Sequence, residues 1–227
     1  MRSDGIDDDI AYVSISINLG TDDVVVMGNI DIQLAESNSE LLLLASTSYG
    51  ESSERLNNAD EMSAISSAIM NNSAVQGFTS ISQTIDGFAL AAGDGNARVT
   101  QFNESAPSDR NGTPMQSAIA GAINAILGGE DLSNGGTHWA GRDIGSPSEK
   151  RATGGLLFTD ASHDLRGLGS QTAPGAPVST SWRNRQGQTT GTRGSYNYTW
   201  ESTAARGETT FMKKTNNFIQ ATGAPRN

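Results

Sequence analysis

A short polar segment, Ser48-Tyr49-Gly50-Glu51-Ser52-Ser53-Glu54, separates two apolar stretches of this chain. The apolar run from Leu41 to Leu44 precedes it, and an amphipathic run over residues 59–72 follows it. This order predicts that Glu51 lies at or just past the C-terminal end of an apolar helix. Helix-end carbonyl groups carry partial negative charge, and an apolar wall removes water, so both disfavour an ionised carboxylate. We therefore expect Glu51 to keep its proton near neutral pH, as a general acid must.

The composition limits the class of protein. The chain has 227 residues, which suffices for one domain with a sizeable core, or for one domain with extensions. Hydrophobic residues make up 35% of the chain and there are 26 glycines, so we expect a modest core with many loops. The net charge of −10 argues against nucleic acid and against anionic membranes as partners, because like charges repel.

Three features that the sequence lacks limit the possible reaction chemistry and the possible cellular location. The chain has no cysteine, which excludes a thiol nucleophile and disulfide bonds. No apolar run is long enough to span a bilayer. The first nine residues are acidic where a secretory signal peptide would be basic. We therefore expect a chain that stays in the cytosol or that another machine moves.

Residues 1–36 are predicted to form a small β-extension. Val13, Ile15, Ile17 and Leu19 alternate with polar residues, which is the period-two pattern of a half-buried strand. The acidic cluster Asp7-Asp8-Asp9 favours a solvated face over a cation site.

Residues 37–130 carry helical patterns. Ser39 is a good N-cap for a first helix, a second helix starts near residues 58–60, and a short helix is expected over residues 80–85. The clearest helix follows Thr113, a capping residue, and Pro114, which suits a first turn. The pair Gly128-Gly129 ends it.

The amino-acid composition differs in the remainder of the chain. Residues 146–195 are rich in Gly, Ser, Pro and Thr and are predicted to form long loops. Tyr196, Tyr198 and Trp200 then alternate with polar residues and predict a strand, with a partner strand over residues 208–213. The predicted fold class is α+β. Its domain covers residues 37–227 and has a mainly helical core with small β elements towards both ends.

Two further segments carry side chains suited to binding. In the segment from Gly128 to Trp139, Trp139 is placed to stack on a sugar face, and His138 either hydrogen-bonds a substrate or satisfies a loop carbonyl. Gln101, fixed by the apolar Phe102 beside it, either lines a groove or anchors a loop.

Zinc is the main rival chemistry. The two histidines, His138 and His163, together with Asp160, make a minimal ligand set for a catalytic zinc ion. Neither a His-Glu-x-x-His pattern nor a Gly-x-Ser-x-Gly elbow occurs. We expect no metal and no cofactor.

The order of motifs resembles the SleB-like cell wall hydrolases. Tyr49-Gly50-Glu51 resembles their opening motif, and the helix over residues 61–72 resembles their second segment. Gln101-Phe102, the helix over residues 116–127 and the Asp131–Trp139 segment follow in the same order. Gly207-Glu208-Thr209-Thr210-Phe211 resembles a divergent form of the closing motif.

This resemblance implies a lysozyme-like fold and a peptidoglycan substrate, cleaved between N-acetylmuramic acid and N-acetylglucosamine. It identifies Glu51 as the catalytic acid, with Glu54 as the displaced equivalent of a second acidic position. The substrate-binding residues that we infer are Tyr49, Gln101, Thr137, His138, Trp139 and Asp143. The chain departs from the family where Ala-Arg-Gly-Glu becomes Ser52-Ser53-Glu54-Arg55, and where Thr209 or Thr210 replaces the closing His.

Several alternatives stay open at this point. The enzyme is either a hydrolase, with Glu54, Asp86 or Asp143 as the second carboxylate, or a lytic transglycosylase, which needs one carboxylate. A non-catalytic wall-binding or virion module and a zinc amidase are the other readings. As a wall-cutting enzyme made in the bacterial cytoplasm without a signal peptide, the chain would act in the periplasm or cell wall of a target cell. It would need delivery, as a type VI secretion effector with an immunity protein or as a phage lysin.

Overall fold

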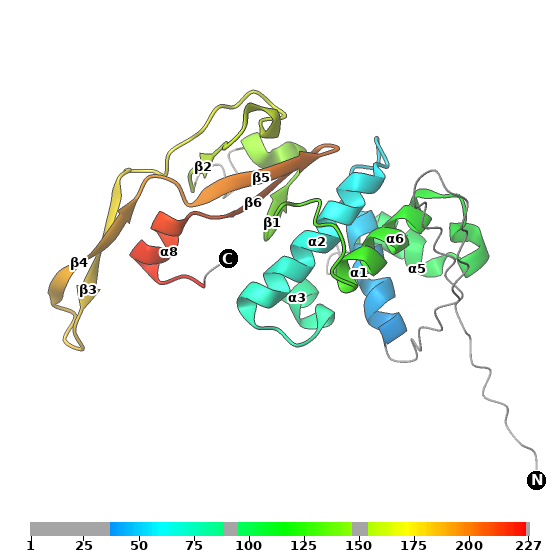
Figure 1. Ribbon diagram of the computed structural model, residues 1–227, viewed down its shortest axis with the longest axis horizontal. Coiled ribbons are helices and arrows are strands. Elements are labelled where there is room, and N and C mark those ends of the chain that lie inside the picture. The colour runs from blue at the N-terminus through cyan, green and yellow to red at the C-terminus, as the bar shows by residue number, and fades with distance from the viewer. Residues whose placement is uncertain (1–36, 89–94, 147–153, 226–227) are drawn as a thin grey trace, which may run out of the picture. The chain divides into compact units, whose positions relative to one another are not determined.

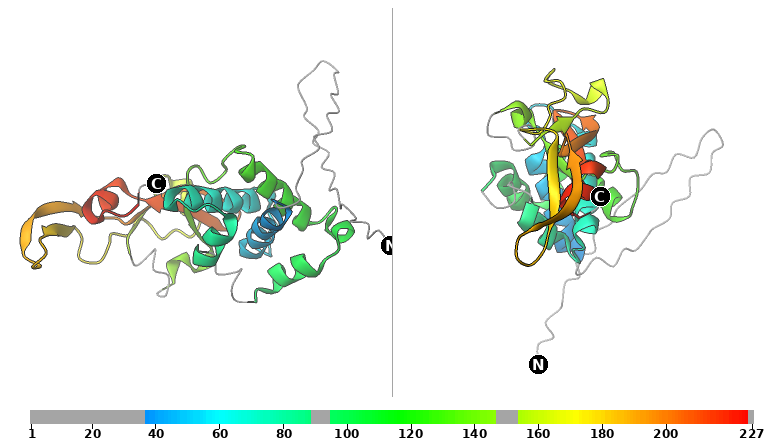
Figure 2. Two further views of the ribbon diagram at one scale, coloured as in Figure 1. Left: turned by 90° about the horizontal axis from the view of Figure 1, so that it is seen from below. Right: turned by 90° about the vertical axis from the view of Figure 1, so that its left-hand side faces the viewer.

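The computed structural model describes residues 37–88, 95–146 and 154–225, and Figures 1 and 2 show it from three sides. The chain divides into two compact units, Met1–Ser39 and Glu40–Asn227. The second unit carries the elements described below, apart from the first turn of the first helix, and it is a mixed α+β fold. The β-extension predicted for residues 1–36 lies outside the described residues.

Helices dominate the first half of the described chain. They are α1 (Ser37–Glu51), α2 (Ala59–Gln76), α3 (Ile81–Phe88), α5 (Ala97–Glu104) and α6 (Pro114–Ile126), with a short 3-10 turn, η1 (Pro107–Arg110). Helix α1 begins at Ser37, two residues before the predicted cap. The predicted helices at α2, α3 and α6 are confirmed. Helix α5 contains Gln101-Phe102, for which the sequence predicts either a groove-lining side chain or a loop anchor.

The helix starts follow from local capping chemistry. The side chain of Asn58 accepts a hydrogen bond from the Glu61 backbone N–H, and Thr113 accepts one from Met115. Asn96 caps α5 in the same way, by accepting from Arg98 and Val99. These side chains satisfy amide groups that a helix cannot satisfy internally, which is why the starts of α2 and α6 could be predicted from the sequence.

Helices α2 and α6 pack closely against each other. Both helices carry small residues that are fully buried: Ala64 and Ala68 on α2, and Ala118 and Ala122 on α6. A side chain added at Gly121 of α6 would place its Cβ 2.8 Å from the Cα of Ser63 on α2. The two backbones therefore approach at a distance that only glycine allows at this crossing.

A four-stranded sheet lies beside α2, whose neighbours include β1 and β5 (Figures 1 and 2). Its order is β1-β6-β5-β2, formed by β1 (His138–Ala140), β6 (Thr209–Lys214), β5 (Trp200–Arg206) and β2 (Leu156–Leu157). Strand β2 runs parallel to β5, and the other pairs are antiparallel, with Trp139 opposite Phe211. The predicted partner strand at residues 208–213 is thus confirmed as β6.

A second apolar core forms over this sheet. Ala140, Ile144, Leu156 and Met212 are buried together, and Phe158, Leu168 and Trp200 pack against them. Ile144 comes from the 3-10 turn η2 (Arg142–Gly145), and a further turn, η3 (Ala161–His163), follows β2. The sheet therefore holds the segment after β1 in a fixed position.

The prediction of long loops over residues 146–195 is wrong in part. The segment contains β2 and most of a two-stranded ribbon, β3 (Val178–Arg183) paired antiparallel with β4 (Thr189–Tyr196). The ribbon escaped prediction because polar residues occupy both of its faces, so no apolar alternation marks it. The predicted strand through Tyr196, Tyr198 and Trp200 is also interrupted, since β4 ends at Tyr196 and β5 begins at Trp200.

A short helix, α8 (Asn216–Thr222), anchors the base of this ribbon (Figure 1). The Thr180 hydroxyl donates a hydrogen bond to the Ala221 carbonyl. The rings of Tyr196 and Phe218 meet edge to face with centroids 5.0 Å apart. The ribbon is therefore fixed at one end, although no third strand of the described chain pairs with it.

We predict that Gly121→Ala destabilises the protein. The added methyl group meets the α2 backbone, so the helices must separate, which costs about 1–3 kcal/mol of the free energy of unfolding. Gly87→Ala in α3 is the matched control, because nothing lies within 4 Å of the added atom. This control should be neutral or stabilising by up to ~1 kcal/mol, since alanine favours helix. Urea unfolding of both variants measures the difference, and equal stabilities would contradict the close packing.

Candidate functional site: an acidic pocket at the end of helix α1

A pocket of about 340 Å³ opens where α1 ends. Four segments contribute to it: the end of α1 with the turn that follows, the first turn of α2, the segment after β1, and the β5–β6 turn. Its lining contains four glutamates and two arginines. The lining residues are Glu51, Ser53, Glu54, Arg55, Glu61, Gly141, Arg142, Glu208 and Thr209.

Glu51 faces this pocket from the last position of α1. Its carboxylate accepts a hydrogen bond of 3.3 Å from the indole Nε1 of Trp139 on β1. Trp139 is only 8% exposed, because the sheet and the helices enclose its ring. A buried donor thus fixes the orientation of a half-buried acid. Trp139 is buried and is not part of the pocket lining, so the expectation that its ring stacks on a sugar face is wrong.

The end of α1 is held in place by α5. Arg98 Nε donates to the Tyr49 carbonyl at 2.8 Å, and Asn96 Nδ2 donates to the Gly50 carbonyl at 3.2 Å. A cation close to the C-terminus of a helix also interacts favourably with the helix dipole. These hydrogen bonds satisfy carbonyl groups at the helix end that have no partner within the helix. They therefore fix the backbone conformation around Glu51.

Tyr49 and Gln101 do not line the pocket, which corrects their assignment as substrate-binding residues. Tyr49 is buried, its ring lies under the Arg98 guanidinium at 4.0 Å, and its hydroxyl donates to Gln101 Oε1 at 3.3 Å. The pair joins α1 to α5, and the neighbouring Phe102 is fully buried. The alternative reading of Gln101-Phe102 as an anchor fits this geometry.

Thr137, His138 and Asp143 also lie outside the pocket lining. Thr137 is buried, and its backbone N–H donates to the Met212 carbonyl at 2.9 Å. His138 contacts the Thr137 hydroxyl through Nδ1 at 3.0 Å, and its ring lies tilted at 56° against Trp200, with ring centroids 4.5 Å apart. Asp143 follows Arg142, which does line the pocket, within η2. None of these three residues belongs to the pocket lining, which corrects their assignment as substrate-binding residues.

The structure shows which of the residues considered for the second carboxylate line the pocket. Glu54 is exposed and lines the pocket, next to Arg55. Asp86 lies on the exposed side of α3 and is not part of the lining. Two further carboxyl groups lie at the pocket: Glu208, and Glu61, whose side chain is buried behind the wall.

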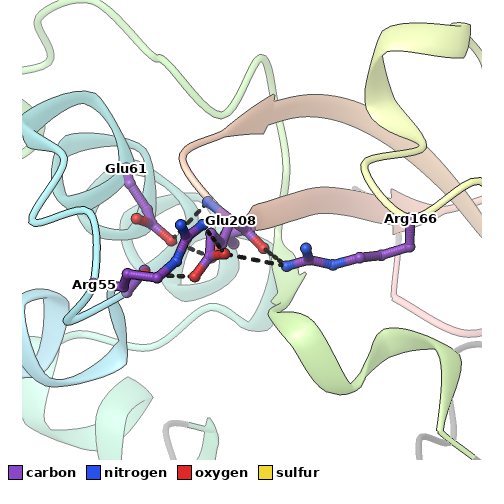
Figure 3. A network of polar contacts seen from close by, with 6 residues as sticks. Arg55, Glu61, Arg166 and Glu208 are labelled. Carbon is purple, nitrogen blue, oxygen red and sulfur yellow. Dashed lines mark hydrogen bonds and ion pairs between the residues drawn. The ribbon is translucent and has the colours of Figure 1, made fainter.

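Glu208 is the centre of a polar network (Figure 3). The Ser53 hydroxyl donates to its Oε2 at 2.6 Å, and Arg55 Nη2 binds its Oε1 at 2.5 Å. Arg166 adds a longer ion pair of 3.9 Å. The hydrogen bond from Arg55, followed by that from Ser53, lowers the pKa of Glu208 to about 2. Glu208 is therefore ionised at every pH at which the protein is expected to work.

Glu61 lies beside Glu208 (Figure 3), but its surroundings disfavour the ionised carboxylate. Its side chain is fully buried, and its Oε1 accepts hydrogen bonds from the Thr209 hydroxyl at 2.7 Å and from the Glu208 backbone N–H at 3.4 Å. Its Oε2 has no hydrogen-bond partner among the described residues. Burial raises the pKa of Glu61, and the hydrogen bonds from Thr209 and Glu208 offset this only in part.

The β5–β6 turn rests directly on Glu61. Gly207 has a φ of 58°, and a Cβ at this position would lie 2.3 Å from Glu61 Oε2. Only glycine fits this contact without displacement. Glu61 therefore sets where Glu208 and Thr209 stand, although it exposes no surface of its own.

The sequence does contain a signal for Glu61. Glu61, Ile65 and Ile69 recur at intervals of four residues, so they share one face of α2, and all three are fully buried. An acid in the first turn of a helix is usually explained by the helix dipole, and this ordinary explanation hides the burial. Glu208 offered no comparable signal, because its partners Ser53 and Arg55 lie more than 150 positions away.

Comparisons with protein families, with curated proteins and with solved structures found no match for this chain. Within residues 37–88, 95–146 and 154–225, no group of three His, Cys, Asp or Glu side chains is arranged to hold a metal ion. His163, one member of the set considered for zinc, contacts the Ser202 hydroxyl through Nδ1 at 2.9 Å.

We predict opposite pH dependences for the two buried acids. The pKa of Glu61 is raised in the folded state, so its contribution to stability is complete below about 4.5 and is lost as the pH rises through the raised pKa. Glu61→Gln imitates the protonated acid, so its stability relative to wild type should increase from pH 5 to pH 8. Chemical denaturation across this range measures the change.

Glu208→Gln should behave in the reverse way. The pKa of Glu208 is lowered to about 2, so its contribution is present above 4.5 and is lost as the pH falls towards 2. This variant should be less stable than wild type at pH 7, and the difference should shrink below pH 4.5. Asp86→Asn, on an exposed helix face, is the control and should show neither trend. Parallel curves for all three variants would contradict the assignment.

Proposed function

We propose that this protein is a peptidoglycan glycosidase with a lysozyme-like fold, which cleaves the glycan strand between N-acetylmuramic acid and N-acetylglucosamine. The observation that carries this proposal is the position of Glu51. It stands at the C-terminal end of α1, faces a pocket with further carboxylates, and is oriented by the buried indole of Trp139. The motif order that resembles SleB-like cell wall hydrolases supports the same residue as the acid.

In this proposal Glu51 acts as general acid. Its proton passes to the glycosidic oxygen, the bond between that oxygen and the anomeric carbon breaks, and positive charge develops on the sugar ring. The leaving sugar departs as an alcohol. Glu51, now a carboxylate, can then act as a base, either for water in a hydrolase or for a hydroxyl of the sugar itself in a lytic transglycosylase.

Glu208 is the carboxylate that best suits the stabilisation of this positive charge. Arg55 and Ser53 keep it ionised and hold its position, and Glu61 fixes the turn on which it stands. A preorganised charge is effective because it needs no rearrangement when the transition state forms. Glu54, the more exposed acid of the same pocket, is the second candidate for this role.

The size and polarity of the pocket agree with a segment of a polymer as the ligand. Its volume of about 340 Å³ lies at the lower end of the range for small-molecule sites. Its lining offers carboxylates, guanidinium groups and hydroxyls, which can pair with sugar hydroxyl and acetamido groups.

Delivery to the wall is part of the proposal. No helix in the described part of the chain is both long enough and apolar enough to cross a membrane. We propose that the protein reaches the periplasm or wall of a target cell as a type VI secretion effector, or as a phage lysin. An effector would require an immunity protein in the producing cell, and a basic surface that enters the acidic pocket would suit that partner.

We predict that Glu51→Gln lowers the rate of glycan cleavage by at least about 100-fold, because a positioned general acid contributes 10²–10⁴ to the rate. The assay is the release of soluble muropeptides from purified peptidoglycan, analysed by mass spectrometry. An anhydro end on the products identifies a lytic transglycosylase, and a reducing end identifies a hydrolase.

Two controls make this test specific. Asp86→Asn removes a carboxylate outside the pocket and should leave the rate unchanged, whereas Glu208→Gln should lower it. Melting temperatures well above the assay temperature for all variants, including the less stable Glu208→Gln, exclude unfolding as the cause. Undiminished cleavage by Glu51→Gln would refute the role of this residue, and an intact glycan with the wild type would favour a non-catalytic wall-binding module.

A further inference from the structure

The ribbon formed by β3 and β4 differs in charge from the rest of the chain. Its residues, 178–196, include Arg183, Arg185 and Arg193 and contain neither Asp nor Glu, whereas the whole chain carries a net charge of −10. Polar Ser, Thr, Asn and Gln side chains fill most of its other positions. A cationic, polar surface of this kind suits an anionic partner and does not suit an apolar one.

An exposed aromatic residue stands among these arginines. Trp182 on β3 is 54% exposed, and the guanidinium of Arg193 lies 4.5 Å from the centre of its ring. This cation–π contact holds the indole in one orientation. Trp and Arg are also the side chains that contribute most often to binding energy at interfaces.

The tip of the ribbon is ordered by its own turn. The Asn184 side chain accepts hydrogen bonds from the Gln186 and Gln188 backbone N–H groups, at 3.0 Å and 2.9 Å. Arg183 Nη1 donates to the Gly187 carbonyl at 2.9 Å. Arg185, at the tip, is exposed and has no hydrogen bond or ion pair to any described residue. An ordered turn therefore presents a cation that contributes nothing to the protein's own core.

Both strands of the ribbon also keep an open edge. Strands β3 and β4 pair only with each other in the described sheets. An open edge presents backbone N–H and C=O groups that an extended peptide can pair with. Carboxylates are the natural partners of arginine, since the guanidinium fork matches two carboxylate oxygens.

We propose that the β3–β4 ribbon is a binding surface for the carboxylate-bearing peptide stems of peptidoglycan, which holds the wall polymer while the pocket at Glu51 acts on the glycan strand. The inference rests on the proposed function, because it names the part of that substrate which the ribbon binds. Extended peptides with free carboxylates match both the open strand edges and the arginines of the ribbon, of which Arg185 has no partner among the described residues.

The test is co-sedimentation of the Glu51→Gln protein with purified sacculi, which measures binding without turnover. Adding Arg183→Gln and Arg185→Gln should weaken binding roughly 3- to 10-fold at low salt, as expected for two exposed charge pairs. The difference should fade near 0.5 M salt, because salt screens such exposed pairs. Trp182→Ala should weaken binding as well.

Two matched controls isolate the charge and its location. Lys213→Gln on β6 removes one positive charge outside the ribbon, whose partner is the partly exposed Glu201 at 3.7 Å, and should leave binding close to its original level. Sacculi whose carboxyl groups have been converted to neutral amides with carbodiimide should bind the parent protein and the ribbon variants equally. Equal binding of these proteins to untreated sacculi would overturn the proposal.

Other partners are distinguishable outcomes that would also overturn it. Loss of binding to phosphatidylglycerol vesicles, with binding to sacculi unchanged, would assign the ribbon to a lipid surface. Loss of self-association in gel filtration, with binding to sacculi unchanged, would assign it to a second copy of the chain. The binding role of the ribbon and the glycosidase activity can be refuted separately. Sacculus binding through the arginines without any glycan cleavage would refute only the glycosidase activity.

Discussion

The contact between buried Glu61 and the β5–β6 turn is the constraint on which the site depends. Glu61 comes from the first turn of α2, and the turn at Gly207 belongs to the sheet, so one carboxyl group joins the helical and the β parts of the fold. The contact tolerates only glycine at position 207. Because the segment after α1 is bound to the same turn through Ser53 and Arg55, the position of Glu51 relative to the sheet follows from this junction.

The surroundings of two neighbouring carboxyl groups thereby shift their pKa values in opposite directions. Glu208 has hydroxyl and guanidinium partners, which favour its ionised form and lower its pKa. Glu61 has lost its solvent and keeps one oxygen without a partner, so its pKa is raised. Two ionised carboxylates in contact repel each other, and the charge of Glu208 therefore also contributes to raising the pKa of Glu61. Pairs of acids whose surroundings separate their pKa values are a recurrent feature of acid–base sites, which is consistent with the chemistry that we propose here.

The two ends of the β3–β4 ribbon differ in what holds them in place. The end near α8 is tied down by Thr180 and by the Tyr196–Phe218 ring contact. The tip, with Trp182 and Arg185, is ordered by local turn chemistry and takes no part in the core. The acidic pocket and the cationic ribbon thus place opposite charges in one unit, which explains why the net charge of the chain alone is a poor guide to its partners.

The sequence by itself determined the local features: the helices capped by Asn58 and Thr113, the strand at residues 209–214, and the position of Glu51 at a helix end. Each of these depends on residues a few positions apart. Only the tertiary structure decided which acids meet. It joined Glu208 to Ser53 and Arg55, buried Glu61, removed Tyr49 and Thr137 from the candidate surface, and paired β3 with a polar β4. Burial and ion pairing between distant segments depend on the packing of the whole unit, and the periodicity of a single segment carries no record of them.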